Sequence, residues 1–300
     1  MTCYKRDRSS FFLAIQSFDN GSCYITINRM IKECFIFHFP ELEDTSTNRW
    51  KSKHNNCCSI WIPSDRAGDS FKDKICFWAQ QANQFLWLSP NSSPIRSHFN
   101  GADIPYCFAG DFNLQLDGTA QRTVLGEAEY RVKYGDISDE KRSYYLSLLM
   151  QSIKQMACFL PIPKRPLYRF PSLFFSSIPL AQDRCDSFVH QLITFAGSQF
   201  TSAQIITPTL RVQKPEMKNL SLNDKIQAWQ SIYSDSANIN IDLSSINGAT
   251  IVIVDDLYQS GTTMLAYASF LKNHGAGSIY GLSCVKSMKN SDNTNNSRQI

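Results

Sequence analysis

The side chains best suited to chemistry lie close together between positions 255 and 263. Two carboxylates, Asp255 and Asp256, follow an apolar run, and a short hydroxyl-rich loop, Ser260-Gly261-Thr262-Thr263, comes soon after them. Hydroxyls and free backbone N–H groups can donate to a phosphate, whereas carboxylates accept hydrogen bonds from the neighbouring hydroxyls of a sugar. A sugar phosphate such as ribose 5-phosphate would satisfy both sets of groups.

The flanking residues predict a strand, a loop and a helix in that order. Ile251 to Val254 is a β-branched run typical of a strand buried on both faces, and we expect it to end at Asp255. Apolar residues from Met264 to Leu271 recur at near-helical spacing, and Gly275 is suited to end the helix. The loop therefore leads into a helix N-terminus, which favours an anion. The alternative is an ordinary capped helix that follows an acidic turn.

Composition indicates a globular protein. Of 300 residues, 43% are hydrophobic and 19% are charged, and the net charge of +4 includes no block of Lys or Arg that would favour nucleic acid. No apolar stretch is long enough for a membrane span or a signal peptide, so we expect a cytoplasmic location. The ten cysteines include no Cys-x-x-Cys pair, which argues against structural zinc and favours buried thiols.

Residues 1–120 are predicted to form a small mixed α/β region of unknown role. Asp69 to Leu88 has the apolar spacing of one amphipathic helix, and residues 101–118 are rich in Gly, Asp and Asn, typical of a connection. Short apolar runs predict strands at Phe11–Ile15, Cys23–Ile27, Cys34–Phe39 and Ser59–Ile62.

Residues 121–288 predict a doubly wound, mainly parallel sheet with helices on both faces, because strand and helix patterns alternate there. The segment Gly126 to Gly135 alternates like a strand, and Ser138 opens a helix. Cys158 to Arg165 is an apolar strand broken by prolines, which would deliver Lys164 and Arg165 at its tip.

The remaining elements of this region complete the alternation. A helix is expected from about Ala181 to Ala196 and a strand from Ala203 to Thr207. Leu210 to Asn219 is polar and basic, typical of a mobile loop, and Ser221 with Asp224 resembles a capping box for the next helix. Residues 289–300 are rich in Asn and Ser and are expected to be a disordered tail.

The segment Val252 to Thr263 resembles the phosphoribosyl pyrophosphate (PRPP) signature of the type I phosphoribosyltransferases. The longer stretch from Val124 to Ser287 resembles the ComF-like (competence protein F) branch of that family. Tyr130–Gly135 is similar to its basic Lys-Tyr segment, Leu160–Pro163 to its Val-Pro-Val-Pro strand, and Arg211–Ser221 to its mobile loop. The resemblance implies the type I phosphoribosyltransferase fold for residues 121–288.

The resemblance also implies a chemistry, in which phosphoribose passes from PRPP to a nitrogenous acceptor with release of pyrophosphate. Asp255 and Asp256 would hold the 2- and 3-hydroxyls, with Mg²⁺ bound through PRPP rather than by the protein alone. The 5-phosphate would rest on the amides of Gln259, Ser260, Gly261, Thr262 and Thr263. The departing pyrophosphate would be neutralised by Lys164 and Arg165, with Arg211 or Lys214 closing over it. Catalysis would then consist of positioning and charge stabilisation.

Departures from the family pattern leave other functions open. The paired-cysteine zinc module of the ComF-like branch is missing, and Met217 and Lys225 stand where the branch has Gln and Arg. These differences favour a PRPP- or nucleotide-sensing module without turnover as one alternative, and an accessory role in DNA uptake or processing is another. The acceptor pocket would be a hood built from residues 1–135, and a homodimer is the partner that the resemblance allows.

Overall fold

The computed structural model describes residues 1–42, 49–66, 68–163, 172–181, 188–215, 217 and 220–288. The described chain forms two compact units. The first contains Met1–Leu88 and Phe159–Pro161, and the second contains Ser89–Cys158 and Ile162–Asn293. Within the described residues, every helix is too short or too polar to traverse a lipid bilayer.

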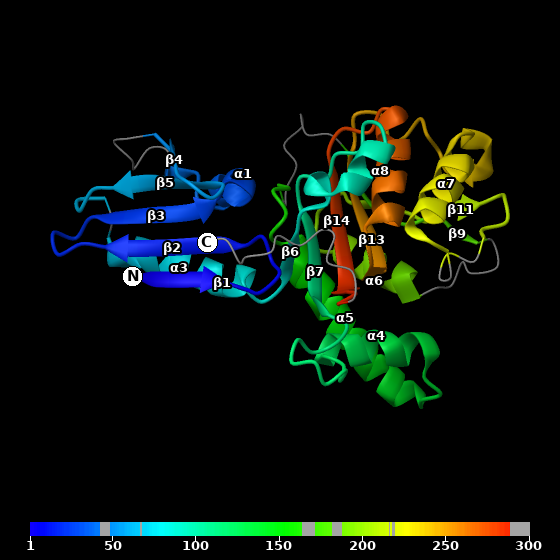
Figure 1. The fold of residues 1–300 in the computed structure, drawn as a ribbon, viewed down its shortest axis with the longest axis horizontal. Coiled ribbons are helices and arrows are strands. Elements are labelled where there is room, and N and C mark those ends of the chain that lie inside the picture. The colour runs from blue at the N-terminus through cyan, green and yellow to red at the C-terminus, as the bar shows by residue number, and fades with distance from the viewer. Residues whose placement is uncertain are drawn as a thin grey trace. The chain divides into compact units, whose positions relative to one another are not determined.

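The first unit is an antiparallel sheet with helices α1 (Lys32–His38) and α3 (Asp69–Ala82). Its strands follow the order β1-β2-β3-β5-β4 (Figure 1). The strands expected near residues 11, 23 and 59 are confirmed. The bounds of the strands are Thr2–Lys5 (β1), Phe12–Ser17 (β2), Cys23–Asn28 (β3), Lys51–Ser52 (β4) and Cys57–Ile62 (β5).

Two expectations for this unit are wrong. The run Cys34–Phe39 forms most of helix α1 rather than a strand, because a short apolar run carries no decisive period. Phe35 and Phe39, four residues apart, pack with ring centroids 5.0 Å apart, as helical spacing allows. The expected helix from Asp69 ends at Ala82, and Leu86–Leu88 form the strand β6.

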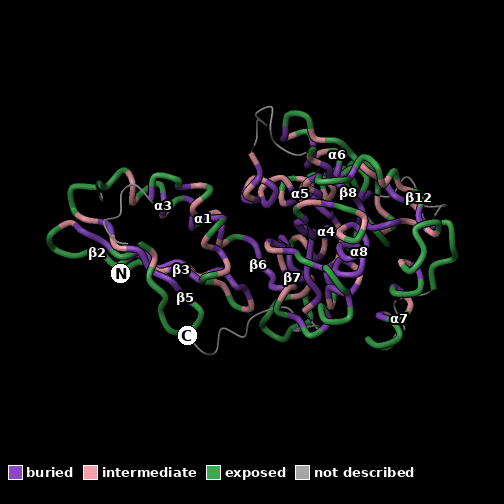
Figure 2. Tube along the Cα trace, turned by 90° about the horizontal axis from the view of Figure 1, so that it is seen from above, coloured by how far each residue is buried: buried purple, intermediate pink, exposed green. Residues whose placement is uncertain are grey.

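The second unit contains a parallel sheet whose strands follow the order β10-β8-β13-β14-β7. Strand β7, labelled in Figure 2, is drawn largely in the purple of buried residues. A small separate sheet has the order β12-β11-β9, formed by Ile239–Asn240, Thr209–Leu210 and Leu180–Ala181. The parallel strands span Cys107–Phe112 (β7), Leu173–Ser177 (β8), Gln204–Ile206 (β10), Thr250–Tyr258 (β13) and Ile279–Lys286 (β14).

Helices cover both faces of this sheet, as expected for a doubly wound fold. A Cβ at Gly110 of β7 would meet side chains of α4 and α5, whereas a Cβ at Gly281 of β14 would meet Met264 of α8. Helix α6 packs against β8 and β13, and α7 packs against α8. The helices span Val124–Tyr134 (α4), Asp139–Ala157 (α5), Phe188–Gly197 (α6), Leu222–Tyr233 (α7) and Thr262–Asn273 (α8).

Local capping explains where several of these helices begin. The Ser138 side chain accepts a hydrogen bond from the Lys141 N–H at the start of α5, and Ser221 accepts one from Asp224 at the start of α7. Both helix starts were predicted from the sequence. Thr123 caps α4 by accepting from the N–H of Gly126, a cap that the sequence analysis did not use.

Three further expectations for the second unit are wrong. Residues 107–112, expected as a connection, form β7 of the parallel sheet. Residues 126–134, expected as a strand, lie in helix α4, where Glu127 and Arg131 pair at helical spacing. No strand forms across residues 158–163, where Pro161 and Pro163 lack the N–H that a sheet requires. The strand that pairs with β13 on the side away from β14 is β8.

Candidate functional site

Strand β13 runs through the acidic pair instead of ending before it. Asp255 pairs with Ser283 of β14, and the ladder continues to Tyr258, which pairs with Lys286. The expected end of the strand at Asp255 is therefore wrong. Because successive residues of a strand point to opposite faces, the Asp255 side chain faces the α7 and α8 side and the Asp256 side chain faces the α4 side.

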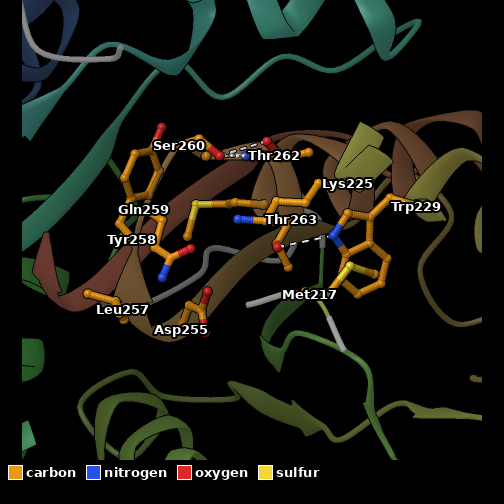
Figure 3. A pocket seen from close by; sticks show the side chains of 12 residues that line it. Met217, Lys225, Trp229, Asp255, Leu257, Tyr258, Gln259, Ser260, Thr262 and Thr263 are labelled. Atoms are coloured by element: carbon orange, nitrogen blue, oxygen red, sulfur yellow. Dashed lines mark hydrogen bonds between the residues drawn. The ribbon is translucent and has the colours of Figure 1, made fainter. Parts of the chain in front are cut away.

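A pocket lies between Asp255 and the start of α8 (Figure 3). The loop from Gln259 to Thr263 forms one wall of this pocket, and Lys225 and Trp229 of α7 contribute to another. Met217 also lines it. The structure thus brings together Asp255 and the whole predicted phosphate loop, and it adds six residues that were not predicted for the site: Met217, Lys225, Trp229, Leu257, Tyr258 and Met264.

The loop enters helix α8 through a glycine in a left-handed conformation. Gly261 has a φ of 81°, in the left-handed region that glycine adopts without strain, and it is the N-cap of α8. Gly261 has no side chain that could accept from the first N–H groups of the helix. Of these groups, the Thr262 N–H donates to the Ser260 hydroxyl at 3.5 Å. The hydroxyls of Ser260 and Thr262 lie 2.7 Å apart and hold the loop together.

Trp229 ties helix α7 to this loop. Its indole Nε1 donates a hydrogen bond to the Thr263 hydroxyl at 3.2 Å (Figure 3), and its side chain is buried. The Lys214 ammonium lies 5.0 Å from the centre of the Trp229 ring, within the range of a cation–π contact. The segment before α7 therefore places a cation next to the pocket.

Asp255 has an unusual acidity. Burial, followed by the negative charge of Asp256, raises the pKa of Asp255 to about 7 from its ordinary value of 3.8. Lys133, Lys214 and the backbone N–H of Asp256, which donates to Asp255 Oδ1 at 2.9 Å, act in the opposite direction. This carboxyl thus changes its charge close to neutral pH, a property often found at functional sites.

Asp256 forms an ion pair with Lys133 of α4. Lys133 also lies 3.3 Å from the carboxylate of Glu129, whose side chain is only 6% exposed. Burial alone would lower the pKa of Lys133, but the charges of Asp256 and Glu129 outweigh it and raise the pKa. Burial raises the pKa of Glu129, against the effect of Lys133.

The remaining predicted cations are distributed differently. Lys164 and Arg165 lie outside the described residues. Arg211 is exposed, donates to the Asn240 side chain at 3.1 Å, and is not part of the pocket lining. Lys214 lies beside Trp229 and influences Asp255. Among the described residues, no group of three or more His, Cys, Asp or Glu side chains could hold a metal ion.

Two lysines near the site were missed as candidates. Lys133 belongs to the Tyr130–Gly135 segment, so the family resemblance already marked its neighbourhood. Lys286 is fully buried at the end of β14 and donates to the backbone oxygen of Gln259 at 3.4 Å, behind the loop. A lysine that ends an otherwise apolar strand was the signal available in the sequence.

Part of the chain matches a known family model, and some solved structures are similar to it. Hypoxanthine phosphoribosyltransferase of Staphylococcus aureus is a similar solved structure, with 14% sequence identity and a TM-score of 0.30. The similarity covers 48% of this chain and 66% of that chain, so this chain spans slightly less than two thirds of that protein. A Trypanosoma cruzi hypoxanthine phosphoribosyl transferase gives 12% identity and a TM-score of 0.30, over 55% and 67%. The curated proteins contain no match. Residues 201–291 match the family model of the phosphoribosyl transferase domain, which places that domain in the C-terminal region.

Proposed function

We propose that the protein binds PRPP at the mouth of helix α8 and transfers its phosphoribosyl group to a nitrogenous acceptor with release of pyrophosphate. The observation that carries this proposal is the left-handed Gly261 at the start of α8, beside the strand-borne Asp255. It supplies donors for a phosphate and an acceptor for a sugar hydroxyl in one pocket. The family match over residues 201–291 includes both groups.

Each residue has a role in this proposal. The N–H groups and hydroxyls from Gln259 to Thr263 bind the 5-phosphate, and Asp255, the signature acid that lines the pocket, binds a ribose hydroxyl. Asp256 faces α4 and acts through Asp255 in this proposal. Lys214 supports the pyrophosphate, and Lys225 of the pocket wall is a further cation for the phosphates. Lys164, Arg165 and Arg211 keep their proposed role at the leaving group. As charge develops on the departing pyrophosphate, these cations stabilise it, and no side chain has to form a covalent bond.

Mg²⁺ fits this site as a companion of the substrate. Mg²⁺ is usually held by one or two carboxylates together with substrate phosphates and water. The described pocket offers the Asp255 carboxylate and loop hydroxyls but no further carboxylate ligand. Bound Mg²⁺ would neutralise part of the pyrophosphate charge. The ComF-like branch, the hood formed by residues 1–135, a homodimer and a cytoplasmic location belong to the same proposal.

A PRPP sensor without turnover is the second candidate. The observation that favours it is the presence of Met217 and Lys225 in the pocket wall, where the ComF-like pattern has Gln and Arg. Met217 offers no hydrogen-bond donor to a phosphate. Such a pocket retains the loop that binds the 5-phosphate and loses a contact that a departing group would use.

Isothermal titration calorimetry with PRPP and Mg²⁺ tests binding. We expect the double variant D255N/D256N to lose binding while its circular dichroism spectrum stays unchanged. Asp65→Asn, at a side chain 75% exposed in the first unit, is the matched control and should bind normally. Undiminished affinity of the double variant would contradict the site. Release of pyrophosphate with a panel of nitrogenous bases indicates a transferase, and binding without release indicates a sensor.

A further inference from the structure

We infer that Lys133 is a positioning residue for sugar recognition, which acts through Asp256 on the pocket carboxylate Asp255 and does not itself touch the ligand. This inference rests on the proposed function. Lys133 lies on α4, far from the PRPP signature in the sequence, yet it is the ion-pair partner of the second signature acid. It therefore connects the basic segment Tyr130–Gly135 to the acidic pair.

The geometry limits how Asp256 can turn. Its side chain is 17% exposed and that of Lys133 is 28% exposed, so both partners of the ion pair are largely shielded from solvent. Glu129, one helical turn before Lys133 and almost fully buried, fixes the ammonium from the other side at 3.3 Å. Lys133 thus contacts the carboxylates of both Glu129 on α4 and Asp256 on β13. Of these two carboxylates, Asp256 is the more exposed.

The same contact reaches the pocket through the backbone. The N–H of Asp256 donates to Asp255 Oδ1 at 2.9 Å, so the position of one acid affects the other. Lys133 also offsets negative charge at Asp255 directly. The Lys133 ammonium therefore acts on both signature acids, on Asp256 through the ion pair and on Asp255 through its charge.

Charge balance gives Lys133 a second effect on ligand binding. Lys133 contacts the carboxylates of Glu129 and Asp256, and its charge also acts on Asp255, in a site that we propose to accept an anionic sugar phosphate. Lys214 is the other cation that acts on Asp255, and it comes from the segment before α7. Without Lys133, the carboxylates would repel each other and the ligand more strongly. We therefore expect its loss to weaken binding even where the fold is kept.

The discriminating probes are ribose 5-phosphate and 2-deoxyribose 5-phosphate. Both carry the phosphate for the loop, but only the first offers the 2-hydroxyl, so their affinity ratio reports hydroxyl recognition alone. In Lys133→Met we expect the preference for ribose 5-phosphate to fall about tenfold, the effect of losing one well-placed hydrogen bond to a charged group. Lys133→Arg should restore most of it, because it keeps the charge and the donor.

A double-mutant cycle tests whether Lys133 acts through Asp256. In the D256N background, Lys133→Met should change the affinity ratio by less than about twofold, because the partner that it positions is already altered. Independent effects of the two substitutions would overturn the inference. Lys133→Gln, which keeps the length of the side chain without its charge, replaces the Met variant if that variant does not fold.

Controls separate this inference from the proposed function and from stability. Lys141→Met removes an exposed lysine at the start of α5 and should leave the ratio unchanged. A lower unfolding temperature with an unchanged ratio would show a purely structural role and overturn the inference. If the unmodified protein binds neither sugar phosphate nor PRPP, the proposed function fails and the inference fails with it. If it binds and Lys133→Met retains the preference, the inference alone fails.

Discussion

Replacing Asp255 by asparagine should stabilise the ligand-free protein, and the gain should grow with pH. The pKa of Asp255 is raised from 3.8 to about 7 in the folded state. As pH rises, the unfolded chain therefore releases this proton first, and the folded state is disfavoured until its own carboxyl ionises. Stability should fall between about pH 4 and pH 7 and then stay constant. The asparagine side chain carries no charge in either state and removes this dependence.

The size of the effect follows from the same difference. Each pH unit between pH 5 and pH 7 changes the free energy of unfolding by at most about 1.4 kcal/mol, which gives a ceiling of about 3 kcal/mol. Asp255 is only half-buried, and solvent screens part of its interaction with Asp256. We therefore expect the advantage of the variant to increase by about 2 kcal/mol from pH 5 to pH 8. For a chain of this size, that corresponds to roughly 5 °C in unfolding temperature.

Thermal unfolding of both proteins at the two pH values, followed by circular dichroism, measures this difference. Comparison at each pH cancels the contribution of other titrating groups that the two proteins share. Asp65→Asn, on an exposed side chain, should show no growth of the difference with pH. A constant difference between the D255N variant and the unmodified protein at pH 5 and pH 8 would refute the reasoning, because it would mean that Asp255 ionises normally in the folded state.

Three further predictions concern the elements that hold the site. Gly126→Ala should lower the free energy of unfolding in urea by about 3 kcal/mol, because its Cβ would lie 2.1 Å from a backbone oxygen. Gly68→Ala, which has open space around its Cβ, should leave this free energy unchanged. Trp229→Phe removes the donor to Thr263 and should weaken binding of inorganic phosphate about fivefold by calorimetry. Ser138→Ala removes the cap of α5 and should lower the free energy of unfolding in urea by about 1 kcal/mol. The affinity for phosphate should stay unchanged.

The strand–loop–helix unit was predictable because its signals are local. The β-branched run from Ile251 to Val254, the glycine at position 261 and the apolar spacing of Met264 to Leu271 each act within a few residues. All three have the expected conformation in β13, Gly261 and α8. The start of α7 at Ser221 was predictable for the same reason, since a cap involves only neighbouring residues.

The end of β13 was not predictable, because a partner strand decides it. Asp255 has low strand propensity, but the ladder with β14 continues past it through Ser283, Val285 and Lys286. These partners lie almost thirty residues further along the chain. Because the strand continues past Asp255, the two acids point to opposite faces of the sheet. The local sequence does not show this pairing, so the two side chains were expected to lie together.

Elements with short or mixed patterns were misassigned for a different reason. Residues 126–134 alternate in polarity, but the pairs Glu127–Arg131 and Glu129–Lys133 have the spacing of a helix, which the alternation obscured. The partner of Asp256 could not be named, because an ion pair between α4 and β13 is a property of tertiary packing. The roles of Lys164 and Arg165 stay predictions.

The position of the acidic pair within a strand has an energetic consequence for any function of this site. Ladder bonds on β13 hold the backbone of Asp255, and little conformational entropy is left to lose when a ligand binds. The same placement partly buries the Asp255 carboxyl next to the charge of Asp256. Both effects raise the pKa of Asp255, which destabilises the unliganded fold at neutral pH. The fully buried run Ile251–Val254 offsets this cost through packing. An acidic residue that is fixed in position before binding, and that lowers the stability of the fold, is expected where the residue type serves binding rather than stability.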